Sequence, residues 1–264
     1  MTRYNEKIMD RLDQKIDKSR IKIQNKSDDR QASDSVIDRN TSELLNKYYA
    51  SGTIEQFVGI ISSGKEAHVY FAYGENHTPI AVKIYKIDPQ NTKWMKNYII
   101  GDPRFKKIGP STQKIIFTWC SKEFKNLREL HRANIPVPLP IKGKNNILLM
   151  EFIGDQNGTP APRLKDIEFT TDPIFEMNQT LDLIKNMYQK AKLVHGDLSE
   201  YNILYWDNKQ YIIDVSQAVS IFHANAQIFL QRDIENTLRF YSQYVTKENL
   251  PNVEEIMKKI IMFT

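Results

Sequence analysis

The chain has 264 residues, 41% hydrophobic and 26% charged, so it can bury a sizeable core in one or two domains. Its net charge of +5 suits phosphate-bearing or RNA partners but does not require them. The single cysteine, Cys120, excludes an internal disulfide and fits a small buried hydrophobe. No apolar run approaches the roughly 18 to 20 residues of a membrane span, so we expect a cytoplasmic protein with no membrane contact.

Residues 1–40 are polar, but Ile8, Leu12 and Ile16 recur every fourth residue, which is typical of an amphipathic helix. Residues 25–40 have the composition of a linker. The pattern then predicts a short helix and three β-strands, at 41–50, 54–61, 67–73 and 79–87.

A basic stretch from Lys86 to Lys114 follows, and its poor periodicity predicts a loop. Aromatic residues alternate with its lysines, so it could grip RNA; a solvated flexible loop is an equal alternative. The remaining predicted elements are a helix, a strand, a helix, two strands and two helices, at 113–132, 147–153, 172–192, 203–206, 210–215, 224–245 and 252–263.

The strongest chemical signal is the string HGDLSEYN at residues 195–202, followed by Asp214 after two isoleucines. Asp197 and Asn202 stand five residues apart between a predicted helix and a predicted strand pair. Phosphoryl transfer needs such a set: a carboxylate for the attacking oxygen and oxygen ligands for a metal. The alternative is that these residues only cap turns, but their combined spacing favours the catalytic interpretation.

Lys83 lies within the strand IAVKIY and points to the face opposite its two neighbours, as a lysine that meets ATP phosphates would. Glu123 on the next helix is the predicted acidic partner, and Glu129 is the alternative. The turn that contains Ser63, Gly64 and Lys65 could bring backbone N–H groups to phosphates, although one glycine makes it a weak signal. His68, which follows this turn, is expected at the surface or packed beside the loop.

Six strings occur in a fixed order: SSGKEAHVY, AVKIYK, YIIGDPRF, LLMEFIG, LVHGDLSEYNIL and YIIDVSQAV. Together they resemble the RIO atypical serine/threonine protein kinases, specifically the type 1 subfamily and its archaeal forms. The resemblance covers about residues 50–240. It implies an α+β fold: a trimmed two-lobed protein-kinase-like architecture with an antiparallel N-lobe sheet plus helix and a small helical C-lobe.

The domain boundaries implied by the resemblance are an N-terminal helical extension and linker at 1–50, a kinase N-lobe at 51–153, and a C-lobe at 154–264. The N-lobe would contain a flexible loop at 86–112 and a hinge at 150–153. The resemblance also makes Asp197 the catalytic aspartate, Asn202 and Asp214 the ligands of Mg²⁺ or Mn²⁺, and Lys83 the ATP lysine. Ser63, Gly64 and Lys65 would lie in the phosphate-binding loop, and the backbone of Glu151 and Ile153 would bond adenine.

Two departures from ordinary kinases affect the expected function. Gly196 replaces the arginine of H-R-D, and only fifty residues follow Asp214, which leaves little room for a peptide-docking surface. We therefore expect ATP hydrolysis or autophosphorylation to matter as much as protein phosphorylation. In the family a phosphoryl group can rest on the residue matching Asp214, and the ATP cycle serves maturation of the small ribosomal subunit, so a pre-ribosomal particle is the expected partner.

Two alternatives remain. Aminoglycoside and choline kinases, which phosphorylate small molecules, also carry H-G-D-x-x-x-x-N followed by I-D. Their large acidic helical lobe is not matched by the short, mixed-charge segment 224–264. A catalytically dead scaffold would require the loss of a core residue, whereas Lys83, Asp197, Asn202 and Asp214 are all present.

Overall fold

The structure is a computed structural model that describes residues 38–105, 108–168 and 172–262. The described chain forms two compact units that divide between Lys86 and Ile87, and each is described by itself. The predicted helix at Ile8–Ile16 and most of the predicted linker lie outside the described residues. The predicted lobe boundary at residues 153/154 stays a prediction.

The first unit contains helix α3 (Arg39–Ala50) and three antiparallel strands, β1 (Gln56–Ser63), β2 (Ala67–Gly74) and β3 (Thr78–Tyr85). The hydroxyl of Tyr49 on α3 accepts a hydrogen bond from the N–H of Phe57, whose ring meets Tyr70 edge to face. Tyr70 pairs with Val82, whereas Lys83 pairs with Val69. Because side chains alternate along a strand, Lys83 projects from the sheet face opposite Tyr70.

His68 is not at the surface, so that alternative is wrong: its exposed fraction is 0%. It lies next to Tyr70 on β2, with ring centroids 6.3 Å apart, and neither ring nitrogen has a hydrogen-bond partner within the described residues. Burial, together with the charge of Lys86, lowers the pKa of His68 below its usual value. The imidazole is therefore held neutral inside the first unit.

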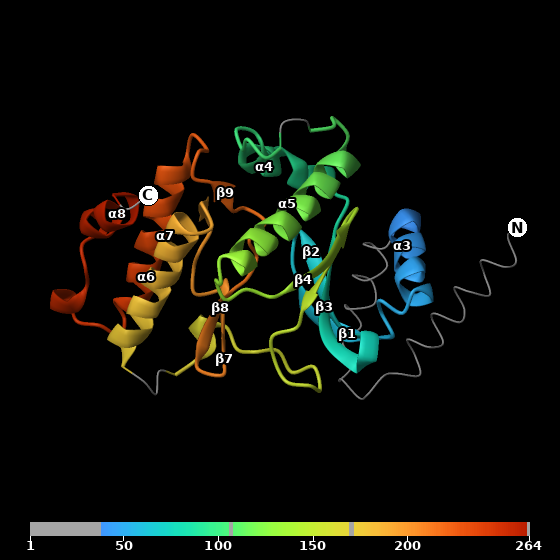
Figure 1. The fold of residues 1–264 in the computed structure, drawn as a ribbon, viewed down its shortest axis with the longest axis horizontal. Coiled ribbons are helices and arrows are strands. Elements are labelled where there is room, and N and C mark those ends of the chain that lie inside the picture. Colours follow the sequence, from blue (N-terminus) through green and yellow to red (C-terminus); the bar gives the residue numbers. More distant parts are fainter. Residues whose placement is uncertain (1–37, 106–107, 169–171, 263–264) are drawn as a thin grey trace, which may run out of the picture. The chain divides into compact units, whose positions relative to one another are not determined.

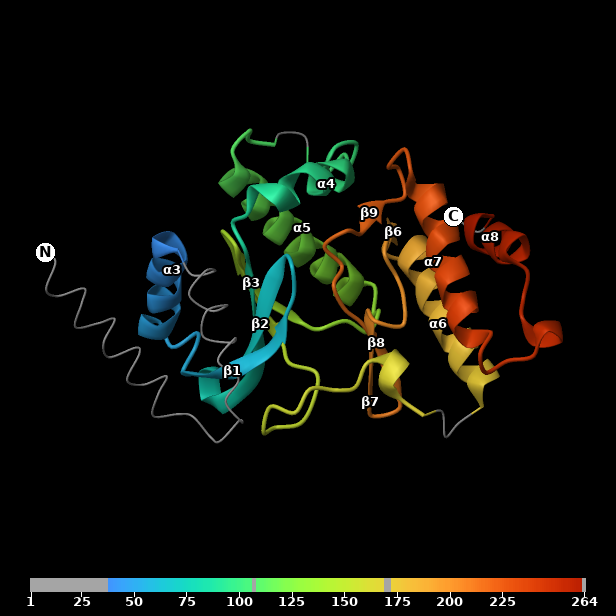
Figure 2. The same ribbon diagram turned by 180° about the vertical axis from the view of Figure 1, so that it is seen from behind.

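The second unit is mostly helical. Its helices are α4 (Pro89–Ile99), α5 (Thr112–Arg132), α6 (Pro173–Gln189), α7 (Ala226–Tyr241) and α8 (Val253–Ile261). Its strands are β4 (Pro140–Lys144), β5 (Ile147–Glu151), β6 (Leu193–Val194), β7 (Ile203–Trp206), β8 (Lys209–Ile212) and β9 (Val219–Ser220). These strands form the antiparallel pairs β4–β5, β6–β9 and β7–β8, and α6, α7 and α8 lie side by side in both views (Figures 1 and 2).

Side-chain caps fix where several of these helices begin. Asp88, Ser111, Asp172 and Asn252 each accept a backbone N–H from the first turn of α4, α5, α6 and α8 respectively. These bonds satisfy N–H groups that have no partner inside the helix. Proline follows the cap of both α4 and α6, where its fixed φ suits the first helical position. The local sequence therefore specifies these helix starts.

The predicted loop at 86–112 is wrong for residues 89–99, which form α4. Met95 and Ile99 are fully buried, and the Trp94 ring meets Trp119 of α5 edge to face at 5.2 Å. Helix α4 lies against α5 in both views of the ribbon (Figures 1 and 2). Its packed positions are Trp94, Met95, Tyr98 and Ile99, which span little more than one helical turn. A pattern this short does not stand out in a sequence rich in lysine.

Cys120 is fully buried in α5, as expected for a small hydrophobe. Within the parts of the chain that the structure describes, no helix is both long and apolar enough to cross a bilayer.

Candidate active site

The loop that carries Asp197 joins β6 to β7, and side chains of α7 hold its backbone by hydrogen bonds. The carboxylate of Asp233 on α7 accepts the N–H groups of Gly196 and Leu198, each at 2.8 Å. Arg232 donates to the Gly196 carbonyl oxygen, and Asn236 donates to that of Leu198 at 3.1 Å. Gly196 has a φ of +79°, which explains why glycine stands where ordinary kinases have arginine. Asp197 itself is exposed on this anchored loop.

Asp233 is an unusual anchor because its side chain is nearly inaccessible, with 1% of the residue exposed. Burial raises its pKa to about 7, against the opposing effect of the two N–H groups and of Arg232. The two hydrogen bonds compensate part of the cost of placing a carboxylate in the interior.

Asp214 lies on a second loop, between β8 and β9. Its φ is +55°, a left-handed conformation that aspartate tolerates better than most residues. The buried hydroxyl of Ser216 donates to its Oδ1 at 3.0 Å. The carboxylate is thus oriented by its own loop and remains on the exposed side.

Helix α5 holds the backbone of this second loop. The Nζ of Lys122 donates to the carbonyl oxygen of Ser216 at 2.8 Å and also to that of Ala218. One turn later, Nδ2 of Asn126 donates to the carbonyl oxygens of Val215 and Ala218, at 2.7 and 2.9 Å. Lys122 and Asn126 are both fully buried. Four hydrogen bonds therefore fix the three residues around the turn after Asp214.

The turn at residues 100–104 extends the same network. Arg104 donates to Oδ1 of Asn126 at 2.8 Å and forms an ion pair with Asp102, whose side chain is fully buried. Although burial would raise the pKa of Asp102, its hydrogen bonds and ion pair with Arg104 lower it below the usual value. Burial and nearby Arg104 hold the pKa of Lys122 well below its ordinary value. The GDPRF segment, residues 101–105, thus supports the Asp214 loop through Arg104 and Asn126.

The two loops meet at Gln217, whose Nε2 donates to Oδ2 of Asp197 at 2.9 Å. Desolvation and the neighbouring charge of Asp214 raise the pKa of Asp197 above its usual value, while Arg232 and Gln217 counteract this shift. The effect of the Asp214 charge on Asp197 shows that the two carboxylates lie close enough to interact.

Asn202 donates Nδ2 to the carbonyl oxygen of Asp197 at 2.9 Å, which fixes its amide and leaves Oδ1 as an acceptor. No group of three His, Cys, Asp or Glu residues suited to a metal occurs in the described ranges. Mg²⁺, however, is commonly held by one or two carboxylates with substrate phosphates and water completing the shell. The oxygens of Asn202 and Asp214 fit that mode of binding.

The first unit carries the predicted phosphate-contacting residues. Ser63 ends β1 and Gly64 and Lys65 form the exposed turn to β2, closed by the Gly64 N–H bonding the Ala67 carbonyl oxygen at 2.9 Å. Lys83 is 7% exposed on β3, with its Nζ 5.1 Å from the centre of the Tyr85 ring. How these residues relate to Asp197 and Asp214 remains a prediction.

Of the two predicted acidic partners of Lys83, Glu123 is 1% exposed on α5. Glu129 instead pairs with Arg132 at the surface of the same helix, at 3.1 Å. A buried carboxylate needs a cation or hydrogen-bond donors, whereas Glu129 already has Arg132. The pairing of Lys83 with Glu123 stays a prediction.

The predicted hinge begins at the end of β5. The N–H of Glu151 bonds the Leu139 carbonyl oxygen at 2.8 Å, and the carbonyl oxygen of Ile153 accepts the N–H of Ala161 at 3.0 Å. Ile153 is 7% exposed, and no described residue accepts a hydrogen bond from its own N–H. An N–H that bonds no described residue is available to an acceptor on a ligand, as the predicted contact with adenine requires.

The sequence alone did not identify four residues that contact the site: Lys122, Asn126, Gln217 and Asp233. Lys122 and Asn126 could have been suspected, since they lie four residues apart among the apolar positions of a predicted helix. Asp233 stands likewise within an apolar helix pattern. A polar residue at a core position of a predicted helix is therefore the sequence feature that could have identified these three residues.

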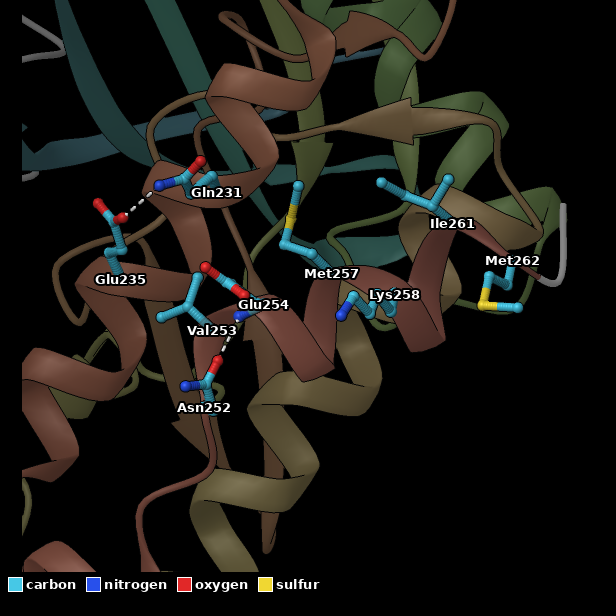
Figure 3. Close-up of a pocket in the computed structure, with 9 residues that line it drawn as sticks. All are labelled: Gln231, Glu235, Asn252, Val253, Glu254, Met257, Lys258, Ile261 and Met262. Carbon is cyan, nitrogen blue, oxygen red and sulfur yellow. Dashed lines mark hydrogen bonds between the residues drawn. The ribbon is translucent and has the colours of Figure 1, made fainter.

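A groove also lies between α7 and α8 (Figure 3). Its apolar part comes from Val253, Met257 and Ile261, and its polar rim includes Gln231 and Glu235. None of the predicted site residues lines it, so it belongs to a separate surface of the second unit.

Several known proteins are similar to this chain in sequence or in fold. The RIO domain family matches residues 68–255, which is more than half of the chain. The chain is 36% identical over 236 residues to the RIO-type serine/threonine-protein kinase Rio1 of Haloferax volcanii, covering 89% of this chain and 80% of that protein. It is 40% identical over 248 residues to serine/threonine-protein kinase rio1 of Schizosaccharomyces pombe, covering 91% of this chain but only 49% of that relative.

The fold resembles that of the Rio2 kinase from Chaetomium thermophilum, solved as an ADP/Mg²⁺-phosphoaspartate complex. The TM-score is 0.63 at 21% identity, and the match covers 81% of this chain and 64% of that one. This likeness confirms the predicted fold class, a trimmed protein-kinase-like fold with an antiparallel sheet and helices. With relatives named RIO1 in an archaeon and in a fungus, the chain belongs to the RIO family of atypical serine/threonine-protein kinases and to its type 1 subfamily.

Proposed function

We propose that this chain transfers the γ-phosphoryl group of ATP to serine hydroxyl groups, in itself or in other proteins, and to water. The observation that carries the proposal is the pair of exposed carboxylates of Asp197 and Asp214. Their loops are anchored from behind by Asp233 and by Lys122, both buried. Such preorganisation is what phosphoryl transfer requires, because most of its catalysis is positioning and electrostatics.

In this proposal Asp197 orients the attacking hydroxyl and accepts its proton. A raised pKa suits that role, since the carboxylate then binds a proton more readily. Asn202 and Asp214 hold Mg²⁺ or Mn²⁺, which neutralises charge on the phosphates. Lys83 contacts the α- and β-phosphates, the Ser63–Lys65 turn covers them, and Ile153 and Glu151 bond adenine through their backbone.

We further propose that Asp214 can carry the phosphoryl group as an aspartyl phosphate and that the ATP cycle acts on small-subunit precursor particles. The first point is supported by the exposure of the Asp214 carboxylate, and the second only by family membership and a net charge of +5. A cytoplasmic location accompanies this role. The relatives from Haloferax volcanii and Schizosaccharomyces pombe are both named protein kinases, which favours protein over small-molecule acceptors.

The test incubates γ-labelled ATP and Mg²⁺ with wild type, Asp197→Ala, Asp214→Asn and Asp182→Asn, an exposed control on α6. Released phosphate and protein label are followed with and without small-subunit precursor particles. Asp197→Ala should abolish turnover while keeping ATP affinity. Hydroxylamine-labile label that requires Asp214, with turnover raised by the particles, supports the aspartyl-phosphate cycle. Acid-stable serine label that ignores the particles supports a protein kinase alone, and equal activity of all four proteins refutes the assigned site.

A further inference from the structure

Gln217 is the only side chain in the described ranges that donates a hydrogen bond to the carboxylate of Asp197, at 2.9 Å to Oδ2. Its neighbours in the chain are fixed, because the carbonyl oxygens of Ser216 and Ala218 on either side both accept hydrogen bonds from Lys122. Gln217 is therefore presented to Asp197 from a rigid turn, and yet it remains partly exposed.

The hydrogen bond between Gln217 and Asp197 determines the orientation of the Gln217 amide group. An ionised carboxylate can only accept hydrogen bonds, so the NH₂ group of Gln217 faces Asp197 and the Oε1 atom lies on the other branch of the same planar amide. Within the parts of the chain that the structure describes, no residue donates to Oε1 of Gln217 or to Oδ1 of Asp197. The pair thus offers two acceptors on adjacent groups beside Asp214.

Two adjacent acceptors match a water molecule better than a hydroxyl group. Water has two protons and can give one to each acceptor, which leaves an oxygen lone pair directed elsewhere; a seryl hydroxyl has one proton and needs only Asp197. We propose that Gln217, together with Asp197, orients a water molecule for attack on the γ-phosphorus of ATP. The inference rests on the proposed function and deepens it by naming Gln217 as the side chain that positions the water.

The step is a simple displacement. The water oxygen forms a bond to the γ-phosphorus, and the bond between that phosphorus and the β,γ-bridging oxygen breaks. ADP leaves with the electron pair, and one water proton passes to Oδ1 of Asp197 and then to the released phosphate. Gln217 keeps its protons and acts by orientation alone.

A purely supporting role for Gln217 predicts a different outcome. If its amide only held Asp197 in place, then its loss would slow transfer to water and to hydroxyl groups by the same factor. If it binds the water, then its loss slows hydrolysis more than transfer. The ratio of the two rates in one reaction mixture separates these roles.

The experiment compares wild type with Gln217→Met, which keeps the length of the side chain, and Gln217→Ala. Gln231→Met is the matched control, since Gln231 is an exposed glutamine on α7 that bonds Glu235. Each protein receives γ-labelled ATP, Mg²⁺ and dephosphorylated casein. Inorganic phosphate and acid-stable protein label are measured together, and fluorescent ADP binding and melting temperature are followed for each variant.

We expect both Gln217 variants to lower the ratio of phosphate release to protein labelling by about tenfold or more, with ADP affinity unchanged, as for loss of one oriented hydrogen bond in a transition state. An unchanged ratio overturns this inference alone, whether the two rates fall together or stay the same. A wild type that labels protein but releases no phosphate also overturns it. A wild type inactive in both assays overturns the proposed function as well, so the two failures are distinguishable.

Discussion

The ammonium group of Lys122 lies 2.8 Å from the carbonyl oxygen of Ser216, two residues after Asp214, and both residues are buried. A lysine in the interior is costly to keep, and here it is retained on the backbone of the loop that presents a predicted metal ligand. Helix α5 and the Asp214 loop are therefore mechanically coupled: a movement of α5 must move the loop or break buried hydrogen bonds.

This coupling predicts the effect of Lys122→Met, which keeps the volume of the side chain and removes its donors. The carbonyl oxygen of Ser216 loses its buried donor, which costs about 1–3 kcal/mol, whereas that of Ala218 keeps the hydrogen bond from Asn126. The cost is offset in part because no amine is buried any longer. We expect turnover to fall about tenfold or more while ATP affinity changes little. Lys125→Met, on the exposed face of α5, is the control. Steady-state kinetics decide, and a variant with wild-type turnover would contradict the coupling.

Asp233 predicts a pH effect on stability. Its pKa is about 7 in the folded chain and near 3.8 when unfolded, so the folded state binds the additional proton between these values. The contribution of Asp233 to the free energy of unfolding should therefore decrease as the pH rises from about 4 to 7. Above pH 7 it should no longer change with pH. Asp233→Asn cannot titrate and should lose this part of the slope, although its baseline stability is lower because an amide replaces one of the two acceptors.

Urea unfolding of wild type, Asp233→Asn and Asp182→Asn at several pH values between 4.5 and 8 tests this point, with Asp182 as an exposed aspartate on α6. If Asp233→Asn keeps the full wild-type slope, the titration belongs to another group.

Six of the strands and most helices could be predicted from the sequence because their signals are local, whereas the short strands β4, β6 and β9 were not predicted. Alternation marks β2 and β3, and side-chain caps mark the starts of α5 and α6. Helix α4 could not be, since its core contacts are with Trp119, twenty-five residues after Trp94, and with Phe229 much later in the chain. Tertiary packing therefore determines that segment more than its own pattern does.

The same contrast holds in the site. Asp197, Asn202 and Asp214 fall within one short stretch, so their spacing alone indicates phosphoryl transfer. Lys122 reaches the Asp214 loop across more than ninety residues, and Asp233 reaches the Asp197 loop across more than thirty. No spacing rule connects such positions, although a charged residue at a core position of a helix hints at a role.

Helix α4 itself is testable. Met95→Ala removes a side chain with no exposed surface, and a buried methionine replaced by alanine typically costs about 2–5 kcal/mol. Lys93→Ala, on the exposed side of the same helix, should change stability by less than about 0.5 kcal/mol. Urea unfolding followed by tryptophan fluorescence suits both, because Trp94 and Trp119 lie in this contact. If the two variants are equally stable, then residues 89–99 are not packed firmly against α5.

The last prediction concerns Lys83 in the first unit and its predicted contact with ATP. The residue is buried and lies on the sheet face opposite Tyr70. Lys83→Ala removes a positive charge that in this assignment meets the α- and β-phosphates, so we expect kcat/KM for ATP to fall about a hundredfold, equivalent to about 2.7 kcal/mol. Lys47→Ala, exposed on α3, serves as the control for loss of charge in the same unit.

Melting temperatures with and without ATP complete the measurement: the control should keep the stabilisation by ATP, and Lys83→Ala should lose most of it. If both variants hydrolyse ATP and respond to it as wild type does, then Lys83 lies outside the nucleotide site and β3 serves only the core of the first unit.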